Sequence, residues 1–299
     1  MNVVLTLLQN GIGVMAPILL AATGGLFTEK SGMLNIALEG LMLVGSFFCV
    51  VLVSQTGNLL LGLTLGVLVT MVLAGWLGFV TLFLKANVFI SGLATNLFAS
   101  GITVVLAFQI YRNKGVIIFH EIPSLGRVTI PIISQVPVLG RLISGHHVFV
   151  YFSWLILVIA WYVLYKTTFG VRLRSVGIND QVLVSLGRNP RNYRMAAFLI
   201  SGFCCGLAGA ILTLSLRAFV PNITAGKGWI ALVVIFLGNK RPMGLFIAAL
   251  VFGFAESLSN YAQGAMNVPA DFILALPYAL TLIAMIGYSV VTYRRQALE

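Results

Sequence analysis

Charged residues are scarce in this chain. Asp, Glu, Lys and Arg make up only 8% of its 299 residues, whereas 60% are hydrophobic. A soluble domain of this length has about a quarter of its residues charged. A water-soluble globular fold is therefore excluded, and a lipid bilayer must be the solvent.

Acidic residues are the scarcer of the two signs, with 7 against 18 basic ones and a net charge of +11. A strongly basic protein is a candidate for nucleic-acid binding. Here, however, the bases lie in the gaps between apolar runs and do not form one polar face. This pattern is typical of a membrane protein, in which bases orient the chain and contact lipid head groups. We expect no nucleic-acid partner.

The residue sets that carry catalysis or bind metals are missing. There is no G-x-x-x-x-G-K-[ST] phosphate loop, so ATP is not hydrolysed by that route. The three cysteines fall inside apolar runs, and no histidine has a metal-ligand partner at helical spacing. An intramembrane enzyme would need a nucleophile and a base at depth, but all three histidines lie within 112–147. We expect no enzyme activity, no metal and no cofactor bound by this chain.

Long apolar runs recur along the whole sequence. A helix needs about 20 apolar residues to cross the hydrocarbon core. Eight runs are about this long, and a ninth, 229–238, is apolar but short, which suggests a half-helix. The sequence thus predicts a single all-α transmembrane domain over 1–299 with about nine membrane helices, one of them short or broken. The eight longer runs are 4–26, 33–54, 59–84, 88–111, 148–165, 195–216, 243–263 and 272–292.

The distribution of bases predicts the orientation. Segment 166–194 carries six bases against one acid, so it should be cytoplasmic. Alternation then places the N-terminus outside and Arg294 and Arg295 inside. Segment 112–147 falls outside, where we expect a hairpin or a small surface helix.

The cytoplasmic segment is too long for a turn. Residues 176–186 can form a short helix with Asp180 and Gln181 near its start, where the helix dipole favours an acid. Gly187 should end that helix, because glycine relieves strain at a left-handed cap. Such a helix suits docking of a cytoplasmic partner, and the alternative is a solvated loop.

Polar side chains also occur within the predicted spans. A carboxylate at bilayer depth is costly and often marks function. Spacing of i, i+4 places Asn35 with Glu39 on one helical face, and Asn87 with Ser91 and Thr95 on another. Such rows line a hydrophilic path or, alternatively, join neighbouring helices by hydrogen bonds. The predicted path residues are Asn35, Glu39, Asn87, Ser91, Thr95, Asn96, Trp229 and Glu256.

Glycines fall into two groups. Gly202, Gly206 and Gly209 fit the small-xxx-small pattern of close helix packing. The others mark expected helix breaks, which are tolerated at depth where they line a cavity or lie buried in protein. These are Gly24, Gly25, Gly226, Gly228 and Gly238.

Several stretches, in order along nearly the whole chain, resemble permease subunits of nucleoside and simple-sugar ABC importers. That group is part of a wider one that includes ribose and branched-chain amino-acid permeases. The first stretch is Gly24-Gly-Leu-Phe-Thr-Glu-Lys-Ser-Gly-Met-Leu-Asn-Ile-Ala-Leu-Glu-Gly40. The others are 86–96, 176–187, 198–209, 228–232, 241–244, 252–255 and 276–281.

The resemblance implies a type II ABC importer permease fold in the bacterial cytoplasmic (inner) membrane. It also implies a cytoplasmic ATPase subunit that carries ATP-Mg, a second permease subunit and an external or periplasmic solute-binding protein. A nucleoside is the expected solute, with a simple sugar or a vitamin such as riboflavin as alternatives. The expected ATPase-coupling residues are Gly177, Asn179, Asp180, Gln181, Ser185 and Gly187.

A second functional class stays open, an ion-coupled secondary transporter. It would need buried acids or unwound carbonyls as ion sites. Glu39 and Glu256 are the deep acidic candidates.

Overall fold

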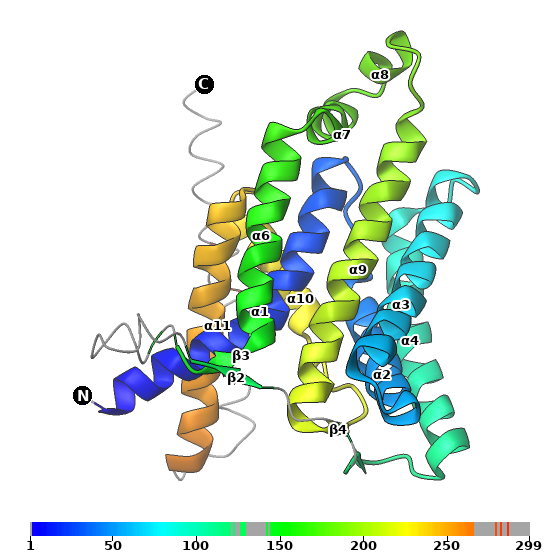
Figure 1. The fold of residues 1–299 in the computed structure, drawn as a ribbon. Coiled ribbons are helices and arrows are strands. Elements are labelled where there is room, and N and C mark those ends of the chain that lie inside the picture. The colour runs from blue at the N-terminus through cyan, green and yellow to red at the C-terminus, as the bar shows by residue number, and fades with distance from the viewer. Residues whose placement is uncertain are drawn as a thin grey trace.

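A computed structural model describes residues 2–120, 126–129 and 144–265, together with a few single residues outside these ranges. Helices dominate it (Figure 1). They are α1 (Asn2–Lys30), α2 (Leu38–Thr56), α3 (Leu59–Leu82), α4 (Val88–Tyr111), α6 (Val148–Lys166), α7 (Thr168–Ile178), α8 (Gln181–Ser185), α9 (Pro190–Leu216), α10 (Lys227–Leu237) and α11 (Pro242–Ala265).

Seven of the described helices are long and apolar enough to cross a membrane: α1, α2, α3, α4, α6, α9 and α11. They confirm seven of the eight long apolar runs as helices. The eighth, 272–292, lies outside the described residues apart from isolated positions. The short run 229–238 also forms a helix, α10. This helix has 11 residues and is therefore about 16 Å long.

Two short β-ladders lie at the end of the bundle opposite α7 and α8 (Figure 1). Strand β1 (Ile117–Ile118) pairs antiparallel with β4 (Ala218–Phe219), and β2 (Arg127–Val128) pairs antiparallel with β3 (His146–His147). The second ladder pairs two stretches of segment 112–147, in which a hairpin or a small surface helix was expected. Most of the residues between these two strands lie outside the described ones.

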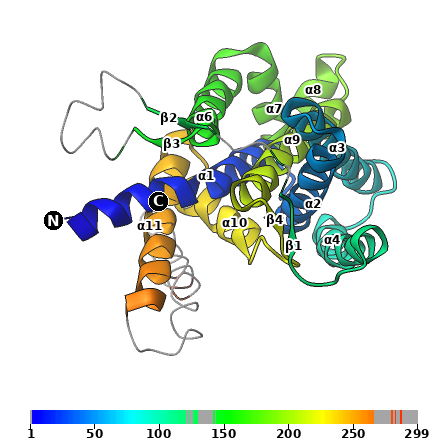
Figure 2. The same ribbon diagram turned by 60° about the horizontal axis from the view of Figure 1, so that its bottom comes forward.

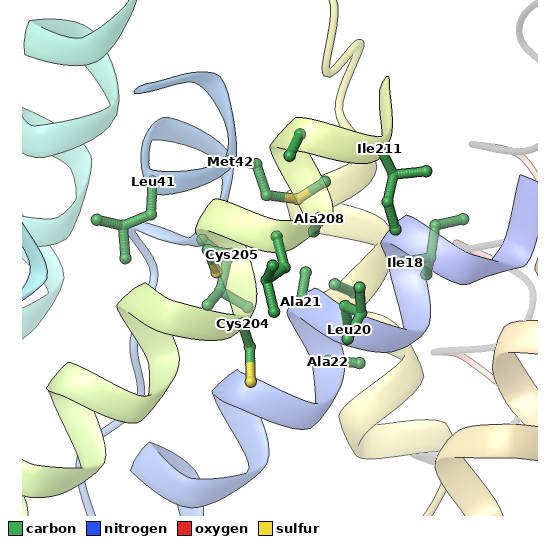
Figure 3. Packing of buried hydrophobic residues seen from close by; sticks show 14 of the residues in the cluster. Ile18, Leu20, Ala21, Ala22, Leu41, Met42, Cys204, Cys205, Ala208 and Ile211 are labelled. Carbon is green, nitrogen blue, oxygen red and sulfur yellow. The ribbon is translucent and has the colours of Figure 1, made fainter. Parts of the chain in front are cut away.

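Helix α9 lies at the centre and packs against α1, α2 and α3. The most apolar windows of α2 and α9 are 72% and 67% buried, against 17% for α4, so α4 is the peripheral helix. Figure 2 shows α4 at one edge of the molecule. Figure 3 shows the small side chains Ala21 and Ala208 between α1 and α9, with Met42 of α2 beside them.

The predicted glycine packing is confirmed. A Cβ at Gly209 would lie 2.1 Å from the Met42 carbonyl oxygen, and a Cβ at Gly45 would lie 2.7 Å from the Gly206 Cα. A Cβ at Gly202 would similarly meet Ala74 and the α3 backbone. Glycine thus lets α9 approach the backbones of two helices at once.

Three expectations about helix ends need correction. Helix α2 begins at Leu38, so residues 33–37 are irregular and Asn35 does not share a helical face with Glu39. The cause is local, because the Asn35 side-chain oxygen accepts a bond from the Ala37 N–H and competes with helix formation. Gly24 and Gly25, expected at a break, instead lie inside α1.

The predicted helix over 176–186 is wrong as a single element. Helix α7 ends at Ile178, Asn179 is extended, and α8 starts at Gln181. The Asn179 side chain accepts a hydrogen bond from the Gln181 N–H, which favours a turn there. Gly187 does end α8 as predicted: its φ is +65°, and Arg188 N–H donates to the Leu183 carbonyl in a Schellman arrangement.

The packing at Gly209 predicts that Gly209→Ala is strongly destabilising. The added methyl cannot avoid the Met42 carbonyl without moving α2 or α9, at a cost of about 1–3 kcal/mol or more. The matched control is Gly101→Ala, since a Cβ at Gly101 meets no atom within 4 Å. Thermal unfolding of the detergent-solubilised chain tests this. Equal melting temperatures for the two variants would contradict the proposed close packing.

Candidate functional site

The start of α10 is held by a carboxylate from another helix. Glu39, in the first turn of α2, accepts hydrogen bonds from the Gly226 and Gly228 N–H groups at 2.9 and 2.6 Å. It also accepts one from the Thr224 hydroxyl at 2.5 Å. Gly226, which caps α10, offers no side chain for this purpose. Glu39 therefore replaces the missing cap and neutralises the positive end of the helix dipole.

This contact lies well inside the bundle. Asn96, eight residues after the start of α4 and so about 12 Å along it, accepts a hydrogen bond from the Gly40 N–H at 2.7 Å. Its amide donates to the Ile36 carbonyl at 3.0 Å. The starts of α2 and α10 thus meet inside the bundle, where side chains from neighbouring helices serve as partners for backbone groups.

The other side of the α10 start carries an ion pair. Lys227 Nζ lies 2.8 Å from Glu256 Oε1 of α11, and both side chains are largely buried. Glu256 Oε2 is buried and has no hydrogen-bond partner among the described residues. The pair borders a cavity of about 710 Å³. Polar residues from α1, α9, α11 and the β3 region line it, among them Gln9, Asn10, His147, Ser215 and Asn260.

Trp229 lies beside this junction and exposes 41% of its surface. Gly226, three residues before Trp229, donates its N–H to Glu39. Asn222, seven residues before Trp229, accepts a hydrogen bond from the Ser100 hydroxyl of α4 at 2.9 Å. The segment therefore combines an accessible indole ring with hydroxyl and amide groups. Such a set can stack on a flat ring and bond to a polar solute.

The predicted row on α4 has a different setting. Asn87 is the N-cap of α4 and accepts hydrogen bonds from Phe89 and Ile90 N–H, so it precedes the helix. Ser91 and Thr95 border a groove of about 630 Å³ between α2, α3 and α4. The groove is mostly apolar, with aromatic side chains such as Trp76. A groove with this lining fits contact with apolar or aromatic groups better than it fits passage of a hydrophilic solute.

Asn35 is fully enclosed by the chain. It is 1% exposed, and its amide donates to the Ser201 hydroxyl of α9 at 2.9 Å. Its oxygen accepts from Ala37, as described above. Asn35 therefore joins the irregular segment 31–37 to α9.

The predicted coupling segment is connected to two spans by one arginine. Arg194, in the first part of α9, donates to both carboxylate oxygens of Asp180 at 2.8 and 2.6 Å. Its Nε donates to the Ser31 carbonyl at 3.2 Å, just after α1. Gly177 packs on α1 as well, since a Cβ there would lie 2.2 Å from the Lys30 carbonyl oxygen. Both carboxylate oxygens of Asp180 are therefore engaged in a bidentate ion pair with Arg194.

The tip formed by α7, α8 and the residues between them also exposes apolar side chains, which sequence reasoning missed. Ile178 is 89% exposed, Leu186 66% and Val182 47%. Gln181 and Ser185 are exposed on the same short helix. Val184 is exposed as well, at 54%. These accessible aliphatic residues outside the spans indicate a protein-binding surface. Val182 and Val184 were the available signal, whereas Leu183 is buried.

The geometry predicts that Glu39→Gln destabilises the chain. Glutamine keeps one acceptor oxygen but directs an amide donor at backbone N–H groups, so at least one buried bond is lost at about 1–3 kcal/mol. Lys85→Gln is the control, because it removes an exposed charge outside this contact. Thermal unfolding in detergent measures both variants. A Glu39 variant as stable as the Lys85 variant would exclude the capping role.

The sequence is similar to known membrane transport proteins over nearly its whole length. Residues 7–285 match the model of a family described as branched-chain amino acid transport system / permease component. The nucleoside ABC transporter permease NupC of Lactococcus lactis is 33% identical over 95% of this chain and 93% of its own. The guanosine ABC transporter permease NupQ of Bacillus subtilis is 33% identical, covering 91% of this chain and 88% of its own.

A putative glucose ABC transporter permease of Haloferax volcanii, TsgC13, is 28% identical over 95% of this chain and 92% of its own. No solved structure matches the chain significantly. The family match covers nearly the whole described bundle and extends past α11. The chain therefore belongs to the family of branched-chain amino acid transport system permease components.

Proposed function

We propose that this chain is the transmembrane subunit of an ATP-driven importer that moves a nucleoside across the bacterial cytoplasmic membrane by alternating access. The substrate class rests on the similarity, along nearly the full length, to relatives named for nucleoside and guanosine transport. The proposed fold is that of a type II importer with about nine membrane helices. That count includes α10 as a span and 272–292 as the last one.

The proposed orientation places the N-terminus and the β-ladders outside and α7 and α8 in the cytoplasm. The bases of 166–194 support it. A solute-binding protein would then meet the end that carries the ladders. The exposed apolar faces of α3 and α4 are available to lipid and to a second permease subunit.

The proposed solute path runs beside the junction of α2 and α10. Trp229 offers a ring for stacking on a nucleobase, and the nearby amides and hydroxyls offer bonds to the sugar. Glu39 acts here by positioning α10, because both of its oxygens already accept hydrogen bonds from the chain. Beside the cavity, Glu256 Oε2 meets no hydrogen-bond donor in the part of the chain that the structure describes.

The energy source is proposed to be a separate ATPase subunit. The sequence has no phosphate loop, and the apolar tip of α7 and α8 supports docking of another protein. ATP binding would bring two ATPase subunits together and shift this tip. The shift would favour one access state of the permease over the other.

Two alternatives keep some support. The relative named for glucose covers 95% of this chain, as NupC does, so a simple sugar stays a candidate. A vitamin such as riboflavin is a further alternative within the same importer class. A secondary transporter would use Glu256 or Glu39 as its ion site. Pairing of Glu256 with Lys227 and capping of α10 by Glu39 favour the ATP-driven class, because both acids are already engaged.

Uptake by the reconstituted importer tests the substrate class. We expect that proteoliposomes containing this chain and its partner subunits accumulate labelled guanosine only when ATP and the binding protein are present. Unlabelled nucleosides should compete, whereas ribose, glucose and riboflavin should not. Accumulation driven by a proton or sodium gradient without ATP would establish the secondary-transporter class, and competition by glucose alone would establish a sugar importer.

The same assay tests the path. Trp229→Leu should lower the apparent affinity for guanosine by up to about tenfold, through loss of ring stacking. Trp76→Leu is the matched control, since Trp76 is 62% exposed but lies on α3 in the apolar groove. Equal effects of the two substitutions would move the path away from α10.

Docking of the ATPase is tested by charge at the tip. Ile178→Asp combined with Leu186→Asp should abolish co-purification of the ATPase subunit, because a buried carboxylate in an apolar interface is costly. The control is Val116→Asp, which introduces an acid at a residue of 52% exposure at the opposite end. Retention of the ATPase by the double variant would show that docking lies elsewhere.

A further inference from the structure

A group of four cations gathers where three elements meet at the α7 end of the bundle. Lys30 ends α1, Arg174 lies in α7, and Lys240 and Arg241 form the turn between α10 and α11. Arg174, Lys240 and Arg241 all lie close enough to the Lys30 ammonium to repel it electrostatically. Glu29 is the acid in contact with this group, and it already pairs with Lys240 at 2.5 Å. Four cations against one carboxylate leave an uncompensated charge of three among the described residues.

The chain holds these cations in place. The Arg174 guanidinium lies 4.8 Å from the centre of the Tyr165 ring, and its buried Nε has no hydrogen-bond partner within the described ranges. Asn239 and Lys240 both have φ above +50°, a left-handed conformation that L-amino acids rarely adopt. Bonds from Lys240 N–H to the Ile235 carbonyl and from Arg241 N–H to Gly238 fix this turn.

Partly buried like charges repel strongly unless an anion compensates them. Lys30, Arg174 and Lys240 are all partly buried, whereas Arg241 is exposed. A flexible solvated loop would let such charges separate. Here a ring contact and a fixed turn oppose that separation, so the arrangement fits a bound anion.

The depth of the group identifies the kind of anion. Lys30 is the last residue of one span, and Arg241 immediately precedes Pro242, the first residue of another. The ends of membrane spans lie at the level of the lipid head groups. Directly beyond Arg241, α11 exposes Met243 and Ile247, at 72% and 57% and one helical turn apart. A charged group that adjoins an exposed apolar helix face matches a molecule with a phosphate and acyl chains.

We propose that Lys30, Arg174, Lys240 and Arg241 bind the phosphate of an anionic phospholipid whose acyl chains lie against Met243 and Ile247 of α11. The site is separate from the solute path and does not depend on which solute is carried. It joins α1, α7 and the turn between α10 and α11. A bound lipid would therefore connect the coupling end of the chain to the spans.

The test uses the full-length chain, purified and delipidated in detergent. It is titrated with phosphatidylglycerol or with phosphatidylcholine of the same acyl chains, and bound lipid is counted by native mass spectrometry. We expect the wild-type chain to retain one phosphatidylglycerol in preference to phosphatidylcholine. Each removed charge should weaken that binding roughly fivefold. Arg174→Gln with Arg241→Gln should therefore remove most of the preference.

The control is the pair Lys85→Gln and Arg188→Gln, which removes two exposed bases outside the group. If Arg174→Gln prevents folding because its ring contact is lost, Arg241→Gln alone still tests the site, since Arg241 is exposed. Three results would overturn the proposal. They are equal binding of the two lipids, equal weakening by the control pair, and displacement of phosphatidylglycerol by inorganic phosphate at matched ionic strength. The last would indicate a site for a free anion.

A protein partner is the remaining occupant that the experiment distinguishes. If the Arg174 and Arg241 variants keep the lipid preference but lose the ATPase subunit on purification, the cations belong to a protein interface and the lipid proposal fails. Loss of the lipid with retention of the ATPase subunit supports it.

Discussion

Backbone N–H groups that begin a helix inside a membrane need partners, because lipid offers none. Helix α10 begins among the other helices of the bundle, beside α2 and α11, and its capping residue Gly226 has no side chain. Glu39 supplies the partner from α2, and Lys227 pairs with Glu256 of α11 on the other side. The close approach also needs glycine, since a Cβ at Gly228 would lie 2.4 Å from the Glu39 nitrogen. Three helices are thus held together at the point where one of them starts.

A related constraint shapes the rest of the bundle. In lipid there is little hydrophobic driving force between helices, so close packing and hydrogen bonds hold them. Helix α9 provides both through Gly206 and Gly209 and through the Thr213 hydroxyl, which donates to the Ser46 carbonyl of α2 at 2.9 Å. Buried small residues make α9 the element against which α1, α2 and α3 pack. The peripheral α4 remains free for lipid or another subunit.

The spans were predictable because about 20 apolar residues in a row have few structural alternatives. The cap at Gly187 was predictable for a similar reason, since few residues adopt its backbone conformation. The break at Asn179 and the irregular segment around Asn35 were not, because each depends on a side chain that competes with the helix. Glu39 and Thr224 are 185 positions apart, and no sequence pattern indicates that they meet.

These contacts form a continuous connection from the tip formed by α7 and α8 to the start of α10. Asp180 binds Arg194, Arg194 binds the carbonyl of Ser31, and the chain from Ser31 reaches Glu39 within eight residues. Between Arg194 and Glu39 the route passes through the irregular segment 31–37, where a bend would leave α1 and α2 intact. Asn35 fixes that segment to Ser201 of α9. A displacement of α7 and α8 would therefore reach the start of α10 either through α9 as a rigid body or through a bend at Asn35, and in both cases Glu39 must move with α2.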